Sequence, residues 1–92
     1  MARADLYLRF RAEVFKEEGL YVAVCPELDV SSFGVTVDEA KESLREAVEA
    51  FIEGGQHLGT LEEVLQEAGF QRENETWVTR ELVAEETLVA VG

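Results

Sequence analysis

Residues 19–55 read GLYVAVCPELDVSSFGVTVDEAKESLREAVEAFIEGG, and this stretch decides the fold. It opens with the apolar run Leu20 to Cys25, which is typical of a strand that is buried on both faces. Pro26 has no backbone N–H to donate to a sheet, so this strand should end there. A short loop over residues 27–30 follows, and residues 31–35 predict a further strand.

An amphipathic helix should follow that strand. Thr36 is a favourable N-cap, and Glu39 lies three residues later, which completes a capping box. At about 100° per residue, apolar side chains gather on one side of this helix and carboxylates on the other. The apolar side holds Val37, Ala40, Leu44, Ala47, Val48 and Phe51, and the other side holds Glu42, Glu46, Glu49 and Glu53, which we call the acidic ridge. We expect the helix to end at Gly54 and Gly55, because glycine commonly follows a last helical turn, and residues 56–59 to be a linker.

The residues before this stretch predict another strand. Over residues 5–16, apolar and polar side chains alternate with period two, as in a half-buried strand. Gly19 supplies a turn residue, so residues 5–16 and 20–25 should pair antiparallel. Together with residues 31–35 they should form a three-stranded antiparallel meander, with one face covered by the helix.

The C-terminal third predicts a short second helix and extended chain. Thr60 and Glu63 repeat the capping pattern before a short apolar stripe, and Gly69 is suited to end that helix. Residues 71–75 predict a polar turn. Residues 76–91 predict one bent strand or two strands, paired with the meander or with a second subunit. We therefore expect an α+β fold in a single domain over residues 1–92, with a core at 5–55 and an extension at 60–91.

The charge of the chain limits its partners. Its 92 residues include 8 Lys and Arg against 20 Asp and Glu, a formal net charge of −12. Nucleic-acid binding normally needs clustered basic residues, so direct DNA binding is not expected. An acidic surface attracts a basic partner, although it also serves solubility alone. The chain shows neither a signal-peptide pattern nor an apolar run of membrane-spanning length, so we expect a cytoplasmic protein without a membrane contact.

Catalytic candidates are few. Cys25 lies in a buried strand and His57 in the expected linker, so a Cys–His nucleophile pair is not expected. The carboxylates near the sheet, among them Glu27 and Asp29, do not show the convergence of a metal site, although a residual metal-dependent nuclease remains a weaker alternative. We expect a binding protein, not an enzyme, with no cofactor and no metal.

The pattern of residues 19–55 resembles the HicB-like antitoxin family. The matching positions are Tyr21, Ala23, Cys25, Pro26, Glu27, Leu28, Gly34, Thr36, Glu39, Ala40 and Leu44. The resemblance implies a partial ribonuclease-H-like core made of the meander and its helix. It also implies a toxin–antitoxin function, in which the chain neutralises a small basic HicA-type ribonuclease by masking its active site. Family members commonly form homo-oligomers, either dimers or tetramers.

The resemblance fits a short form of the family. Longer members often end in a DNA-binding domain, whereas residues 56–92 here carry only Arg72 and Arg80 as basic residues besides the single histidine. The candidate partner-binding residues are Tyr21, Glu27, Asp29, Glu42, Glu46, Glu49 and Glu53. The alternative function is a stand-alone oligomeric module, regulatory or ligand-binding, that has no toxin partner.

Overall fold

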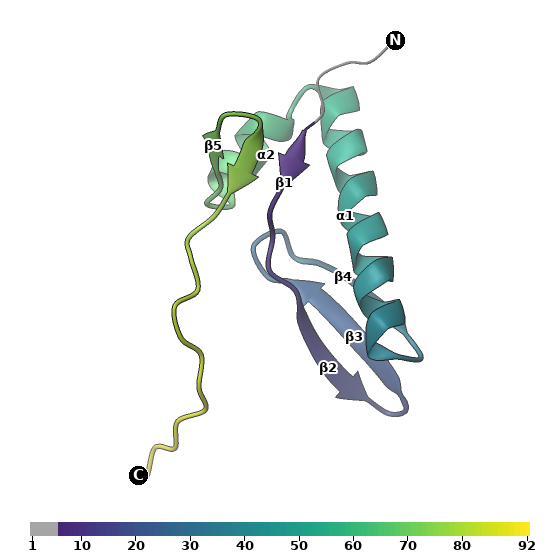
Figure 1. Ribbon diagram of the computed structural model, residues 1–92, viewed down its shortest axis with the longest axis vertical. Coiled ribbons are helices and arrows are strands. Elements are labelled where there is room, and N and C mark those ends of the chain that lie inside the picture. The colour runs from purple at the N-terminus through teal and green to yellow at the C-terminus, as the bar shows by residue number, and fades with distance from the viewer. Residues whose placement is uncertain (1–5) are drawn as a thin grey trace.

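A computed structural model describes residues 6–92 of the chain (Figure 1). In chain order its elements are β1 (Tyr7–Leu8), β2 (Glu13–Glu17), β3 (Leu20–Cys25), β4 (Val30–Gly34), α1 (Val37–Leu58), α2 (Leu61–Glu67), β5 (Gln71–Glu73) and β6 (Thr76–Val78). The expected α+β class is confirmed: α1 packs against a three-stranded antiparallel sheet, and a short helix and C-terminal strands follow.

The sheet β2–β3–β4 is the expected meander. The β2–β3 hairpin turns at Glu18 and Gly19, whose φ angles of 47° and 86° are those of the two-residue turn that suits twisted strands. On the face toward α1, Ala23 and Cys25 are fully buried beneath Leu44 of the helix. The first hydrophobic cluster is therefore a sheet–helix contact built from small strand residues and a large helix residue.

Helix α1 begins as predicted but ends later. The Thr36 Oγ1 accepts a hydrogen bond from the Glu39 N–H at 3.0 Å, which confirms the N-cap. The prediction that the helix ends at Gly54 and Gly55 was wrong, because α1 continues through Leu58 and the expected linker is its last turn. It ends at Gly59, whose φ is 74°.

The reason for the longer helix lies in its packing. A Cβ atom on Gly55 would lie 3.0 Å from Cδ1 of Leu61, so this glycine lets α2 approach α1 closely. The chain turns between the helices through hydrogen bonds from Gly59 N to Gln56 O and from Thr60 N to Gly55 O, at 3.1 and 3.0 Å. Thr60 makes no side-chain cap for α2, contrary to expectation, because its ψ of 4° departs from the extended backbone that an N-cap residue normally adopts.

The prediction of one continuous strand over residues 5–16 was wrong. Residues 7–8 form β1, which pairs in parallel with β6, whereas β2 pairs with β3, so the extended segment serves two different sheets. The predicted alternation still holds, since Leu8, Phe10 and Val14 all pack against the core. Residue 5, where the strand was expected to begin, lies outside the described residues.

The second sheet has the order β1–β6–β5 and lies beside α2 (Figure 1). The expected polar turn at residues 71–75 is instead a hairpin, in which β5 pairs with β6 and Asn74 takes the left-handed conformation at φ 60°. The second hydrophobic cluster is formed by Leu61, Leu65, Phe70 and Trp77. Leu8, Phe10, Leu28 and Ile52 contact both clusters, so the two sheets are joined through apolar side chains.

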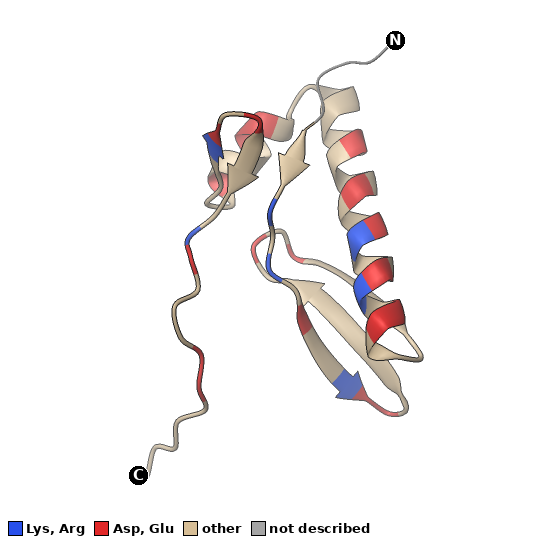
Figure 2. Cartoon of the chain, in the orientation of Figure 1, with Lys and Arg blue, Asp and Glu red and all other residues tan. Residues whose placement is uncertain are grey.

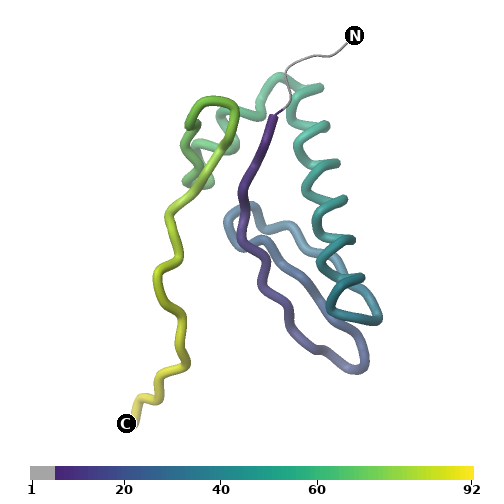
Figure 3. The backbone as a smooth tube through the Cα atoms, in the orientation of Figure 1, coloured from purple at the N-terminus to yellow at the C-terminus, as the bar shows by residue number. Residues whose placement is uncertain are grey.

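The C-terminal tail, residues 79–92, departs most from expectation. Only Thr76–Val78 of the predicted strand is paired, and residues 79–92 form no helix or strand. The backbone trace shows this segment running away from the body toward the C-terminus (Figure 3). The radius of gyration is 15.4 Å, against about 12 Å for a compact domain of this length. After β6, these residues pair with no strand of either sheet.

Candidate functional site

The acidic ridge lies on the outer side of α1, as the sequence predicts. Ala40, Leu44 and Val48 face the sheet with at most 1% of their surface exposed. The carboxylates of the ridge lie on the exposed surface of the helix, and acidic residues follow its length in Figure 2. The helix therefore presents one apolar side to the core and one anionic side to solvent.

Arg45 divides the ridge into paired and unpaired carboxylates. Its guanidinium contacts Glu42, and its Nη1 lies 2.6 Å from Oε2 of Glu49. The hydrogen bond from Arg45 lowers the pKa of Glu42 and raises the pKa of Arg45 itself. Glu46 and Glu53 have no ion pair with any described residue, so they are the carboxylates most available to a partner.

The loop after β3 does not add to this surface as the sequence suggested. Glu27 turns inward, with 7% of its side chain exposed, and its Oε2 lies 3.5 Å from Nη2 of Arg11. Arg11 also pairs with Glu13. The other oxygen of Glu27, Oε1, is buried and has no hydrogen-bond partner among the described residues. Glu27 is thus engaged with Arg11 in the segment before β2 and is not exposed to a partner.

Asp29 and Tyr21 lie apart from each other. Asp29 is exposed at φ 56°, a left-handed position that aspartate tolerates in turns. Tyr21 is half-buried on the side of β3 that faces α1, where it packs against the first hydrophobic cluster. Of the seven candidate residues, the structure brings the four ridge carboxylates together on one helix and distributes the other three between the core and a loop.

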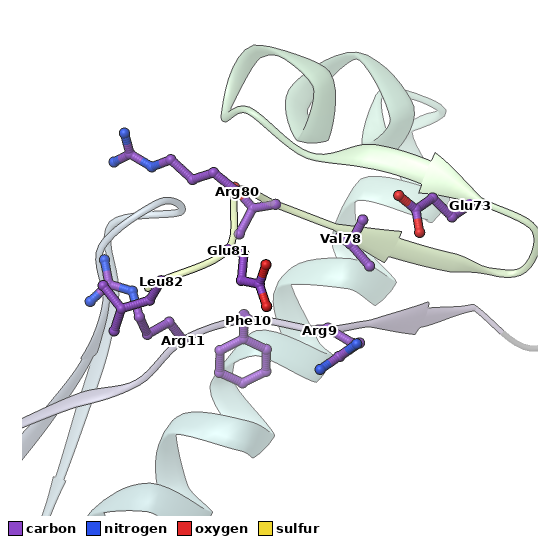
Figure 4. A pocket seen from close by; sticks show the side chains of 9 residues that line it. Arg9, Phe10, Arg11, Glu73, Val78, Arg80, Glu81 and Leu82 are labelled. Carbon is purple, nitrogen blue, oxygen red and sulfur yellow. The ribbon is translucent and has the colours of Figure 1, made fainter. Parts of the chain in front are cut away.

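A mixed-charge cleft separates the segment before β2 from the start of the C-terminal tail (Figure 4). Its volume is about 450 Å³, and its lining includes Arg9, Arg11 and Arg80 together with Glu81. The three arginines do not converge, because Arg11 is paired with glutamates and Arg80 projects away from the cleft in Figure 4. The cleft therefore lacks the concentrated positive charge that a polyanion requires.

The residues considered for nucleophilic catalysis lie apart. Cys25 is completely buried against the helix, and this burial raises the pKa of its thiol. His57 is exposed in the last turn of α1. Cys25 belongs to the same buried cluster as Val48, and His57 lies nine residues beyond Val48, which is about 13 Å farther along the helix axis. Within residues 6–92, no three His, Cys, Asp or Glu side chains are grouped closely enough to hold a metal ion.

Sequence reasoning missed one surface, which we call the outward face. It is the side of β2–β3–β4 opposite α1, and its central row pairs Phe15 with Val22 and Val22 with Phe33. Phe15 is 51% exposed and Phe33 is 62% exposed. A shallow hollow of about 440 Å³ lies here, lined in part by Leu20. The signal was present in the sequence, because a strand that is apolar on both faces needs cover on both, and only one long helix is available.

Comparisons with protein-family models, curated proteins and solved structures gave no match to this chain. Among the helices of the described residues, none combines the length and the apolar character needed to cross a bilayer. The acidic ridge and the outward face are therefore the two surfaces from which a function can be argued.

Proposed function

We propose that this chain is an antitoxin-like binding protein that neutralises a small basic HicA-type ribonuclease by masking its active site. The observation that supports the proposal is the acidic ridge, which carries carboxylates on the exposed side of a helix whose other side is fixed to the sheet. The resemblance of residues 19–55 to HicB-like antitoxins supplies the class of partner. The proposal implies that the protein acts in the cytoplasm and carries out no catalysis of its own.

The physical basis is charge complementarity. Ridge carboxylates recur every three or four residues, which places them about 5 Å apart along the helix axis. A ribonuclease must attract RNA phosphates with lysine and arginine side chains, and the same side chains attract a row of carboxylates. Complementary potentials also speed encounter between the partners. Because α1 is held rigid by the core beneath it, the ridge would block an active site without first having to fold.

The test is co-expression of the chain with any small basic protein that is encoded beside it. We expect a stable complex and rescue of growth. The double variant Glu46→Gln/Glu53→Gln should bind about two- to thirtyfold more weakly, since exposed ion pairs contribute about 0.2–1 kcal/mol each and about 1.4 kcal/mol is a factor of ten in affinity. The control Glu67→Gln/Glu75→Gln removes the same charge from exposed positions off the ridge and should bind like the wild type. Absence of both a complex and rescue with the wild-type chain would exclude the antitoxin function.

A second candidate function is a stand-alone oligomeric module without a toxin. The outward face favours it, because a patch of exposed phenylalanines is typical of a protein–protein interface. This candidate predicts self-association and no small basic protein encoded nearby. Inspection of the flanking genes separates it from the antitoxin function, and homo-oligomer formation is compatible with both.

A further inference from the structure

We propose that the C-terminal tail of one copy docks on the outward face of a second copy, and that the second copy returns its own tail to the first. The result is a two-fold dimer held by exchanged tails. This inference deepens the homo-oligomer part of the proposed function and does not depend on a toxin. It assigns a role to the two apolar features that the fold leaves uncovered.

The first of these features is the tail itself. Its large aliphatic residues are exposed by 52% to 93%, and they are Leu82, Val83, Leu88, Val89 and Val91. An extended segment that exposes a run of large aliphatic side chains to water is suited to dock on an apolar surface of a partner. At about 3.3 Å per residue, residues 79–91 can span roughly 43 Å. The tail is therefore long enough to reach across a neighbouring copy.

The second feature is the outward face. The cross-strand row Phe15–Val22–Phe33 runs over all three strands, and Leu20 borders the hollow beside it. In an antiparallel sheet with one face on the core, the other face normally carries polar side chains. Here that face instead offers aromatic rings to a partner. Strands of five or six residues make this face about 17 to 20 Å long, so one extended tail would cover it.

The exposed area supports a partner of this size. The chain exposes 7220 Å², whereas a compact monomer of 10.3 kDa would expose about 5400 Å². The difference, roughly 1800 Å² per chain, is of the order that each subunit of a stable homodimer buries. Docking of both tails would remove much of this surplus from water, and at about 25 cal/mol per Å² apolar burial is the main favourable term in association.

Residues 79–92 pair with neither sheet of their own chain. It leaves β6 beside residues 9–15, where Leu82 and Glu85 line a hollow with Val14 and Phe15, and then continues past the body (Figure 3). Residues 79–91 contain no glycine, proline or asparagine to form a tight turn back. A second copy offers the matching face, and a two-fold axis satisfies both tails at once. The tail of a second copy is therefore the segment that covers the outward face.

The exchange can be tested by complementation between full-length variants. The face variant is Phe15→Glu/Phe33→Glu, and the tail variant is Leu88→Glu/Val89→Glu. All four positions are exposed, so each variant should retain the wild-type circular dichroism spectrum. The control Gln66→Glu/Gln71→Glu adds the same charge at exposed positions outside both surfaces. Mass is measured by light scattering after size-exclusion chromatography at micromolar concentration.

We expect dimers for the wild type and the control, and monomers for each variant alone. An equal mixture of the two variants should recover a dimer, because the tail of the face variant meets the intact face of the tail variant. This mixed dimer keeps one of two contacts and should dissociate at least tenfold more readily than the wild type. A monomeric wild type would overturn the inference. A tail variant that stays dimeric, or a mixture that stays monomeric, would overturn it as well.

Salt dependence separates this inference from the proposed function. Two copies that each carry a charge of −12 repel, so added salt should tighten the dimer by screening. Binding of a basic toxin to the ridge should instead weaken with salt. A dimer without a toxin complex would leave the exchange standing and remove the antitoxin function. A dimer that weakens as sodium chloride rises from 50 to 500 mM would overturn the exchange, since apolar contacts could not then be its main support.

Discussion

Replacing Gly54 with alanine should stabilise the protein. Gly54 lies inside α1, its φ is not in the left-handed region, and a Cβ atom there would meet no other atom within 4 Å. Alanine is favoured over glycine in a helix interior by about 0.8–1.0 kcal/mol. In a domain of this size a gain of about 1 kcal/mol raises Tm by roughly 4–8 °C. We therefore expect Gly54→Ala to melt several degrees above the wild type.

Two other glycine-to-alanine variants provide reference points for this change in stability. Gly55→Ala replaces glycine with alanine in the same helix, but the new Cβ would lie 3.0 Å from Cδ1 of Leu61. Its gain in stability should therefore be smaller than that of Gly54→Ala, or become a loss. Gly34→Ala would place a Cβ atom 2.6 Å from the backbone nitrogen of Ala40, which forces β4 away from α1. Overpacking of this kind costs about 1–3 kcal/mol. The expected order of stability is Gly54→Ala, wild type, then Gly34→Ala.

The assay is denaturant unfolding followed by far-ultraviolet circular dichroism and by Trp77 fluorescence. Protein concentration is held constant because self-association shifts apparent stability. If α1 ended at Gly54, as the sequence alone suggested, that glycine would adopt a positive φ and alanine would cost about 1 kcal/mol or more. A destabilised Gly54→Ala chain would therefore refute both the helix boundary and the reasoning based on it.

Further predictions concern the core, the thiol and the ridge. Leu44→Ala should lower the free energy of unfolding by about 2–5 kcal/mol in denaturant titrations, because Leu44 is fully buried. Trp77→Phe should cost much less than Trp77→Ala, for which about 3–5 kcal/mol is expected, since the buried indole N–H has no partner among the described residues. The buried Cys25 thiol should react with Ellman's reagent only after denaturation. The hydrogen bond from Arg45 lowers the pKa of Glu42, so this pair stabilises the fold at any pH above the ordinary carboxyl pKa. The stabilisation is lost as the pH falls through the lowered pKa. Glu42→Gln should flatten that part of a plot of stability against pH.

Local patterns predicted the elements whose causes are local. The apolar run of residues 20–25 predicts a strand, and the helical spacing of Leu44 and Val48 specifies the buried side of α1, each within a few residues of chain. The Thr36 cap is equally local, since it involves a hydrogen bond to a residue three positions away. The ridge followed from the same spacing, because carboxylates opposite a buried stripe must face solvent.

Features that depend on distant partners could not be predicted in this way. The role of Gly55 depends on where Leu61 lies, since glycine both ends helices and permits close packing. The inward turn of Glu27 depends on Arg11, which the sequence separates from it by a whole hairpin. The first extended segment splits into β1 and β2 because Leu8 pairs with Trp77, which lies far along the chain.

That pairing of β1 with β6 also has a consequence for folding kinetics. The meander and α1 form between neighbours along the chain, whereas β1 meets β6 only after the long loop between Leu8 and Trp77 has closed, at an added entropic cost. We expect the meander and α1 to be structured in the folding transition state and the second sheet to join afterwards. Substitutions at Trp77 should then accelerate unfolding and leave the folding rate almost unchanged. The lifetime of the native state would be governed by the smaller of the two sheets.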